Sequence, residues 1–179
     1  MRLDLVPLTF AIALTALPLN GREVPREVRH STEPKPLPLA LNDVFRIRKV
    51  SSLQLDPIVQ AAATARGGIS NSYLQAEIDR RYYGAVSNLE RRMREGHYYN
   101  FEWSTSKTAD LTIRFEYRQE KLGLAVQLIE MDYPRAKGTY RSEFSVIGDD
   151  YYQDGPVTAW RVTLVENGRI VGVNQSFLW

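Results

Sequence analysis

Residues 160–166 (WRVTLVE) and residues 169–175 (RIVGVNQ) flank the dipeptide Asn167-Gly168. An Asn-Gly dipeptide between two β-prone stretches predicts a two-residue hairpin, because a type I′ turn needs a positive φ at both central residues. Counting outward from the turn pairs Glu166 with Arg169, Leu164 with Val171, Val162 with Val173 and Trp160 with Gln175. One face of this hairpin is then almost wholly apolar. The sequence therefore predicts an antiparallel sheet with one buried side.

The same two-residue alternation of apolar and polar side chains occurs before the hairpin. It is present at residues 99–103, 111–118, 124–132 and 139–147. With the hairpin, these stretches predict an antiparallel β-sandwich of about six strands at residues 97–179. Strand number and alternation resemble those of immunoglobulin-like domains, without the cysteine signature of antibody domains. This resemblance implies a fold and says nothing about activity.

A sandwich of this size without disulfides needs large aromatic side chains in its core. The expected core residues are Phe101, Trp103, Phe115, Phe144, Trp160 and Phe177. Trp179 is expected in the core or at an edge of the sandwich.

Residues 1–21 are predicted to be a signal peptide. Arg2 precedes an apolar stretch at residues 5–19, which is too short and too interrupted by proline for an ordinary transmembrane helix. Asp4 weakens the basic region, and the cleavage site is ambiguous. An uncleaved membrane anchor and a buried strand or helix are therefore alternatives. The prediction is an exported protein, periplasmic or extracellular, that meets a membrane only through an uncleaved N-terminus.

Residues 22–41 are predicted to be an extended linker, because Pro25, Pro34, Pro36 and Pro38 favour polyproline-like chain. His30 lies in this linker and is expected to be a solvated side chain. Residues 42–96 are predicted to be a helical segment with a short strand at residues 44–50. A first, alanine-rich helix is expected to begin at Asp56-Pro57 and to end at Gly67-Gly68. The fold class is thus mainly β with N-terminal helices, or α+β.

A second helix is predicted at residues 72–95, where Ser72 and Gln75 have capping-box spacing and Gly96 ends the helix. Pairs at i,i+4, Glu77 with Arg81 and Glu90 with Arg94, support it. Its apolar stripe comprises Leu74, Ile78, Tyr82, Ala85, Leu89 and Met93. Such a stripe must dock. It packs on the sheet, on a second copy or on a protein partner.

Composition excludes several classes of function. The formal charge of +2 comes without a dense basic block, which argues against nucleic-acid binding. The absence of cysteine removes disulfides, thiolate zinc sites and cysteine nucleophiles. With only two histidines, a histidine-based metal cluster is also disfavoured. The sequence predicts no metal, no cofactor and no catalytic constellation.

The strongest candidate ligand-binding residues are Asp149, Asp150, Tyr151, Tyr152 and Asp154. Their oxygen atoms have the chemistry for Ca²⁺, although the spacing fits no EF-hand, and their aromatic rings have the chemistry for a sugar. Bracketing by Gly148, Gly155 and Pro156 favours a solvated turn. His97, between the helix and the first strand, is expected to cap the helix rather than act as a base.

These observations favour an exported, non-catalytic binding or assembly module of unknown partner. The alternative is a carbohydrate-binding or hydrolase accessory domain that uses the acidic and aromatic loop at residues 149–154.

Overall fold

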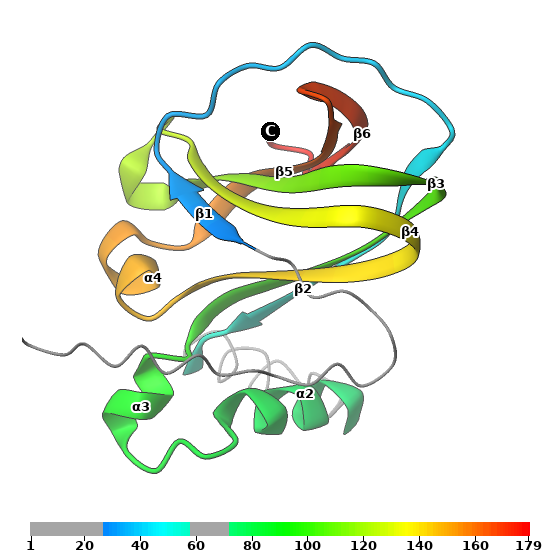
Figure 1. Cartoon of the computed structure of the whole chain (residues 1–179). Coiled ribbons are helices and arrows are strands. Elements are labelled where there is room, and N and C mark those ends of the chain that lie inside the picture. The colour runs from blue at the N-terminus through cyan, green and yellow to red at the C-terminus, as the bar shows by residue number, and fades with distance from the viewer. Residues whose placement is uncertain (1–26, 58–71) are drawn as a thin grey trace, which may run out of the picture.

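The computed structural model describes residues 27–57 and 72–179 (Figure 1). The predicted signal peptide and almost all of the predicted first helix lie outside the described residues. The elements are β1 (Val28–Ser31), β2 (Phe45–Leu55), α2 (Ser72–Tyr82), α3 (Asn88–Arg92), β3 (Gly96–Gln119), η1 (Glu120–Leu122), β4 (Gln127–Ile147), α4 (Asp149–Asp154), β5 (Val157–Glu166) and β6 (Arg169–Gln175). The fold is mainly antiparallel β-sheet with a few helices, as predicted.

The described strands form one six-stranded antiparallel sheet. Five of them follow the order β1-β4-β3-β5-β6, and the sixth, β2, also pairs with β3. β4 pairs along both halves of β3, whereas β2 pairs with the first half of β3 and β5 with the second half. We call β2 with residues 96–105 and 138–147 the β2 layer. We call β1, β5 and β6 with residues 109–119 and 127–136 the β5 layer. The two layers face one another (Figure 1).

The change of layer occurs where β3 and β4 both depart from regular pairing. In β3 the register shifts between Thr105 and Ala109 and again before Leu111. In β4, Arg135 and Gly138 have φ values of 50° and 90°. Bulges of this kind bend a strand without ending it. Residues 97–179 therefore hold four strands, and the prediction of six is wrong. A single folded sheet does not establish an immunoglobulin-like topology.

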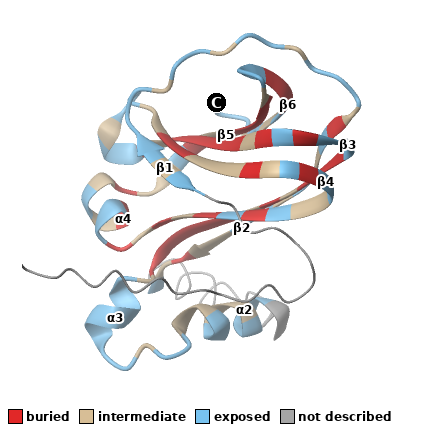
Figure 2. Cartoon of the chain, in the orientation of Figure 1, coloured by how far each residue is buried: buried red, intermediate tan, exposed pale blue. Residues whose placement is uncertain are grey.

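The core lies between the two layers (Figure 2). Phe101 of the β2 layer packs on Phe115 and Trp160 of the β5 layer, with both ring centroids at 5.5 Å. Phe101, Trp103, Phe115 and Phe144 are buried as predicted, and Trp160 is partly buried.

One of the aromatic predictions fails, and of the two places expected for Trp179, the core and an edge, the core is excluded. Phe177 is fully exposed, so its assignment to the core is wrong. Trp179 lies outside the core, where its ring stacks on the guanidinium groups of Arg118 and Arg161 at 4.7 and 4.9 Å. Both residues follow the end of β6, so the strand alternation no longer fixes the side on which they lie.

The predicted hairpin is present, and Asn167 and Gly168 have φ values of 50° and 71°. Glu166 pairs with Arg169 as predicted. Val165 pairs with Ile170 in the same register, and a shift between Leu164 and Val165 then changes the pairs that follow: Leu164 with Gly172, Val162 with Asn174 and Arg161 with Gln175. The predicted pairs beyond the turn are wrong because the bulge adds one residue to β6.

Residues 27–44 form strand pairs and backbone hydrogen bonds with the sheet, which the predicted extended linker does not include. β1, which the sequence does not predict, pairs with residues 128–131 of β4, and His30 is exposed. Residues 31–40, which we call the strap, then cross the outside of the β5 layer (Figure 1). At its end, Ala40 donates a backbone hydrogen bond of 2.8 Å to Ile170, which donates one of 2.9 Å to Pro38. The short strand predicted at residues 44–50 is β2, which continues to Leu55.

The single helix predicted at residues 72–95 is wrong, because Gly84, with φ 79°, separates α2 from α3. Ser87 and Glu90 form a capping box that begins α3. Glu90 is therefore engaged in capping rather than paired with Arg94. Gly96 begins β3, and an added Cβ there would overlap the carbonyl oxygen of Val146.

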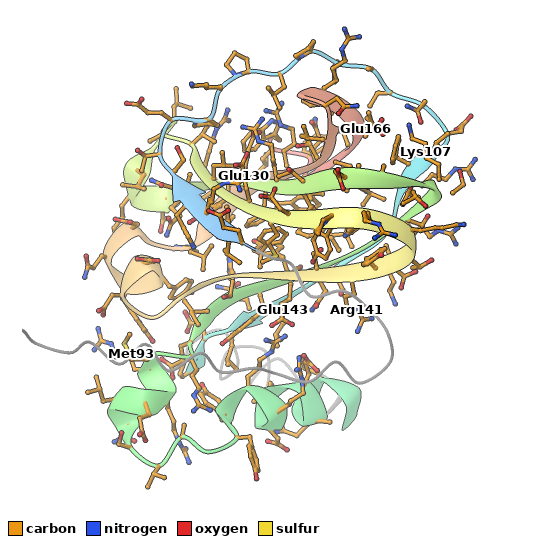
Figure 3. All side chains as sticks on the ribbon, in the orientation of Figure 1. Met93, Lys107, Glu130, Arg141, Glu143 and Glu166 are labelled. Atoms are coloured by element: carbon orange, nitrogen blue, oxygen red, sulfur yellow. The ribbon has the colours of Figure 1, made fainter. Side chains whose placement is uncertain are left out.

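Helix α2 lies against the outside of the β2 layer (Figure 3). The guanidinium group of Arg81 stacks 4.0 Å from the ring of Tyr98 and forms ion pairs with Glu77, at 3.2 Å, and with Glu143. The predicted Glu77–Arg81 pair is thus present, and Arg81 attaches the helix to the sheet.

Candidate functional site

The predicted ligand-binding residues form α4 instead of a turn. The side chains of Asp149 and Asp150 are exposed, whereas Tyr151 is buried and Tyr152 is half-buried. The helix therefore separates the aromatic side chains from the first two acids. Within the described ranges, no three histidine, aspartate or glutamate side chains lie close enough together to hold a metal ion.

The two tyrosines join a polar group that the sequence did not bring together. The hydroxyl of Tyr151 donates a 2.7 Å hydrogen bond to Asp56 and accepts one of 3.1 Å from Gln54. Glu95 is buried and accepts hydrogen bonds from the hydroxyls of Tyr82, at 3.1 Å, and of Tyr152. We call Asp56, Tyr82, Glu95, Tyr151 and Tyr152 the tyrosine cluster. It joins the ends of β2 and α2 to the start of β3 and to α4.

The tyrosine hydroxyls of this cluster are held in their protonated form. Burial, with a smaller contribution from the neighbouring carboxylates, raises the pKa of Tyr82 and of Tyr151 to about 12. Burial, together with the hydrogen bond to Glu95, raises the pKa of Tyr152 well above its usual value. These hydroxyls therefore act as hydrogen-bond donors to carboxylates, and because they stay protonated at neutral pH they are not available to accept a proton from a substrate.

His97 lies beside the cluster, with its ring 5.6 Å from that of Tyr151. Its Nδ1 accepts a 3.3 Å hydrogen bond from the backbone N–H of Val157 and lies 3.3 Å from the hydroxyl of Tyr99. Its Nε2 is buried without a hydrogen-bond partner among the described residues. Burial lowers the pKa of His97 to about 4, so the imidazole is neutral at pH 7. Its predicted role as a helix cap is replaced by a place on the inner face of β3, opposite Gln54.

Sequence reasoning missed three members of this region, Asp56, Glu95 and His97. Asp56 was assigned to a helix start, and Glu95 received no role. For His97 a signal was present, because it shares the two-residue alternation of Tyr99 and Phe101 and so belongs to the buried face. For the two acids no local signal existed, since Asp56 meets Tyr151 across 95 positions of sequence.

We expect the stability of the protein to fall in acid through His97. The unfolded chain protonates this histidine below about pH 6.5, whereas the folded state does so only near pH 4. Between these values the unfolded state binds more protons, so the free energy of unfolding drops by about 2 to 3 kcal/mol towards pH 4. In His97→Gln the free energy of unfolding should no longer show this decrease. Urea unfolding of both proteins at about pH 7 and about pH 4 measures it. Equal pH dependence in both proteins would contradict the assignment.

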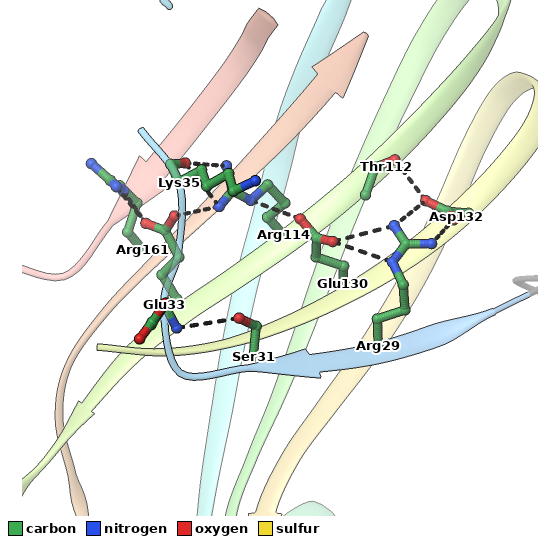
Figure 4. Close-up of polar contacts among 10 residues, drawn as sticks. Arg29, Ser31, Glu33, Lys35, Thr112, Arg114, Glu130, Asp132 and Arg161 are labelled. Carbon is green, nitrogen blue, oxygen red and sulfur yellow. Dashed lines mark hydrogen bonds and ion pairs between the residues drawn. The ribbon is translucent and has the colours of Figure 1, made fainter. Parts of the chain in front are cut away.

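A second polar group lies on the outside of the β5 layer, beneath the strap (Figure 4). Its members alternate in charge across the strands: Asp132, Arg29, Glu130, Arg114, Glu116 and Arg161. We call them the charged ladder. Arg114 is 3.0 Å from Glu130 and 3.3 Å from Glu116, and it donates to the carbonyl oxygen of Lys35 in the strap at 3.3 Å. Three arginines balance three carboxylates, so the ladder joins strands and strap and leaves no net charge for a ligand.

Several apolar side chains are exposed on α2, on α3 and in the turn between them (Figure 2). They are Leu74, Tyr83, Val86, Leu89 and Met93, which we call the helical apolar patch. Val86 is 90% exposed and Leu89 is 69% exposed. Of the stripe predicted to dock, Ile78, Tyr82 and Ala85 are partly covered, whereas Leu74, Leu89 and Met93 are exposed.

Among the residues that the structure describes, no helix combines the length and the hydrophobicity needed to span a bilayer. Comparison with protein-family models, with curated protein sequences and with solved structures gives no match. The residues and their geometry are therefore the basis on which a function can be proposed.

Proposed function

We propose that this chain is an exported, non-catalytic binding or assembly module, in which a sandwich-like sheet carries a helical docking surface. The observation that carries the proposal is the helical apolar patch. Large apolar side chains that are exposed on neighbouring segments are typical of protein–protein contact sites. Glu90, Arg91 and Arg92 lie on α3 beside Leu89, so charged side chains surround the apolar ones, as at the rim of an interface. The partner is a second copy or another protein with an apolar surface.

The absence of catalysis is part of the proposal and is supported by the state of the tyrosine cluster. Its carboxylates accept hydrogen bonds from tyrosine hydroxyls whose pKa values are raised, and the neighbouring imidazole is buried and neutral. Groups engaged with one another in this way stabilise the junction of β2, β3 and α4. Export rests on the apolar stretch at residues 5–19.

The alternative, a carbohydrate-binding or hydrolase accessory role for residues 149–154, has less support. A sugar platform needs open aromatic faces. Tyr151 is buried, and the guanidinium group of Arg92 lies 4.3 Å from the centre of the ring of Tyr152.

The expected result of replacing both Val86 and Leu89 with aspartate is a loss of association of at least about tenfold, because the charges would have to be desolvated in the interface. Sedimentation of the chain alone measures self-association, and binding assays with candidate partner proteins measure association with another protein. Leu124→Asp is the control, since Leu124 is 84% exposed but lies between η1 and β4. Equal association of the double variant and the control would disprove the docking role.

A further inference from the structure

The outside of the β2 layer carries a basic hollow near the bend of the sheet. It has a volume of about 340 Å³, and Arg46, Arg48, Ser104 and Thr139 are among its lining residues. A neighbouring hollow of about 300 Å³ shares Thr139 and is lined by Glu102, Tyr140 and Arg141. We call the two together the basic hollow. It lies away from α4 and from the helical apolar patch.

A β-bulge brings the cations of β2 to this surface. In a regular strand, Arg46 and Arg48 would share a face and Lys49 would point to the other. The register shifts between Ile47 and Lys49, so that Arg46 lies opposite Ser104 and Lys49 opposite Glu102, both on the outer face. Bulges commonly redirect side chains in this way next to functional sites.

The charges around the basic hollow are not balanced. Of its described lining residues, Arg46, Arg48 and Arg141 are cationic, whereas Asp43 and Glu102 are anionic. Arg48 and Arg141, like the neighbouring Lys49, are exposed and have no carboxylate oxygen within 4.0 Å among the described residues. Asp43 lies 3.7 Å from Arg46, and Glu102 lies between Lys49 and Arg141 in the strand register. Glu143, two residues after Arg141, is ion-paired with Arg81. This surface therefore differs from the charged ladder, in which every arginine has a carboxylate partner.

Arg48 is oriented by a buried group. Its Nε donates a 2.9 Å hydrogen bond to the hydroxyl of Ser104, which is 7% exposed. The terminal nitrogens of the guanidinium group make no hydrogen bond to the described residues, and they have the planar geometry that binds a carboxylate or sulfate through two hydrogen bonds. Ser106 and Thr139 add hydroxyl groups to the same lining.

We propose that the basic hollow binds an acidic polysaccharide. Arg48 and Arg141 hold anionic groups of the chain, and Ser106 and Thr139 bond its hydroxyls. The two arginines lie on β2 and β4, which flank β3, so their backbones are roughly 10 Å apart. Arg48 lines one hollow and Arg141 lines the adjoining one, and two such cationic positions match a polymer with repeated charges, which can occupy both at once.

The surface favours a polysaccharide over a single-stranded nucleic acid, because bases bind by stacking on exposed aromatic rings. The ring of Tyr140 stacks on Trp103 at 4.7 Å, and the ring of Tyr98 lies beneath Arg81. These two rings are thus already covered. Arginines and hydroxyls remain for contact with a ligand.

The test measures binding of the full chain to immobilised polygalacturonate at low salt, with neutral dextran and single-stranded oligothymidylate as comparison ligands. We expect Arg48→Gln combined with Arg141→Gln to weaken polygalacturonate binding at least about tenfold, since both contacts are charge-assisted. Lys35→Gln combined with Arg169→Gln removes the same charge elsewhere on the exposed surface and should leave binding unchanged. Arg141→Gln alone, at an exposed side chain without a hydrogen bond to the described residues, should weaken binding without affecting the fold.

Four results would overturn the proposal. These are absence of binding to polygalacturonate, equal binding to dextran, equal weakening by both double variants, and tighter binding to the oligonucleotide than to the polysaccharide. The last result would assign the surface to nucleic acid instead. The helical apolar patch is untouched by these variants, so the outcome is independent of the proposed docking role.

Discussion

Replacing Trp103 with alanine is expected to lower the free energy of unfolding by about 3 to 5 kcal/mol. Trp103 has no exposed surface and lies just before the bend of β3. Its ring packs 4.7 Å from that of Tyr140 and 5.0 Å from that of Tyr133. Its Nε1 donates a 2.9 Å hydrogen bond to the hydroxyl of Ser142. Alanine would leave a cavity between these rings and remove the hydrogen-bond donor, so the loss combines packing with an unsatisfied polar group.

Urea unfolding at neutral pH measures this loss, and Phe177→Ala is the control. It makes an aromatic-to-alanine change at a fully exposed position and should shift stability by less than about 0.5 kcal/mol. Trp160→Ala should lie between the two, since Trp160 is only partly buried against Phe101. If Trp103→Ala unfolded at the same urea concentration as Phe177→Ala, the packing described for the bend would be wrong.

The sequence predicts the faces of the strands well and their lengths poorly. Alternation correctly places Phe101, Trp103 and Phe115 in the core, because side chains on successive residues of a strand point to opposite sides. It divides β3 and β4 into two strands each, because residues at a bulge interrupt the alternation just as a turn does. Polar residues such as Thr105 and glycines such as Gly138 are common to both.

In the candidate sites, too, residues that are adjacent in sequence could be predicted, whereas residues brought together only by the fold could not. Tyr151 and Tyr152 could be singled out from their neighbours in sequence, whereas Asp56 and Glu95 acquire their roles only when the end of β2 and the start of β3 lie beside α4. The cations of the basic hollow could not be grouped in advance. The bulge after Ile47 decides which side of the sheet each one occupies.

The charged ladder was also hidden from sequence reasoning. Arg114 and Glu116 alternate with Ile113 and Phe115, which predicts two polar side chains facing water. In the structure both polar side chains are 4% exposed, because the strap crosses the same face. The proline-rich residues, expected to be a spacer, thus change the environment of charges about eighty positions away in the sequence.

The second large effect is expected for Arg114→Met, which should lower the free energy of unfolding by about 3 to 5 kcal/mol, the usual result of removing one partner from a buried ion pair. Glu116 and Glu130 would each lose a buried cation, and the strap would lose its hydrogen bonds from Arg114 to Lys35. Hydrogen exchange should then become faster at the amide of Ala40, which bonds to Ile170 at the end of the strap.

Lys107→Met is the matched control, since it removes a cation 2.8 Å from Glu166 in a pair whose lysine is 52% exposed. Exposed pairs contribute about 0 to 1 kcal/mol and are screened by salt. The destabilisation by Arg114→Met should therefore be several times larger than that by Lys107→Met, and it should persist in about 1 M salt. If the two variants lost equal stability, or if salt removed the effect of Arg114→Met, the strap would not shield the ladder from water, and its covering of Arg114 and Glu116 would have to be rejected.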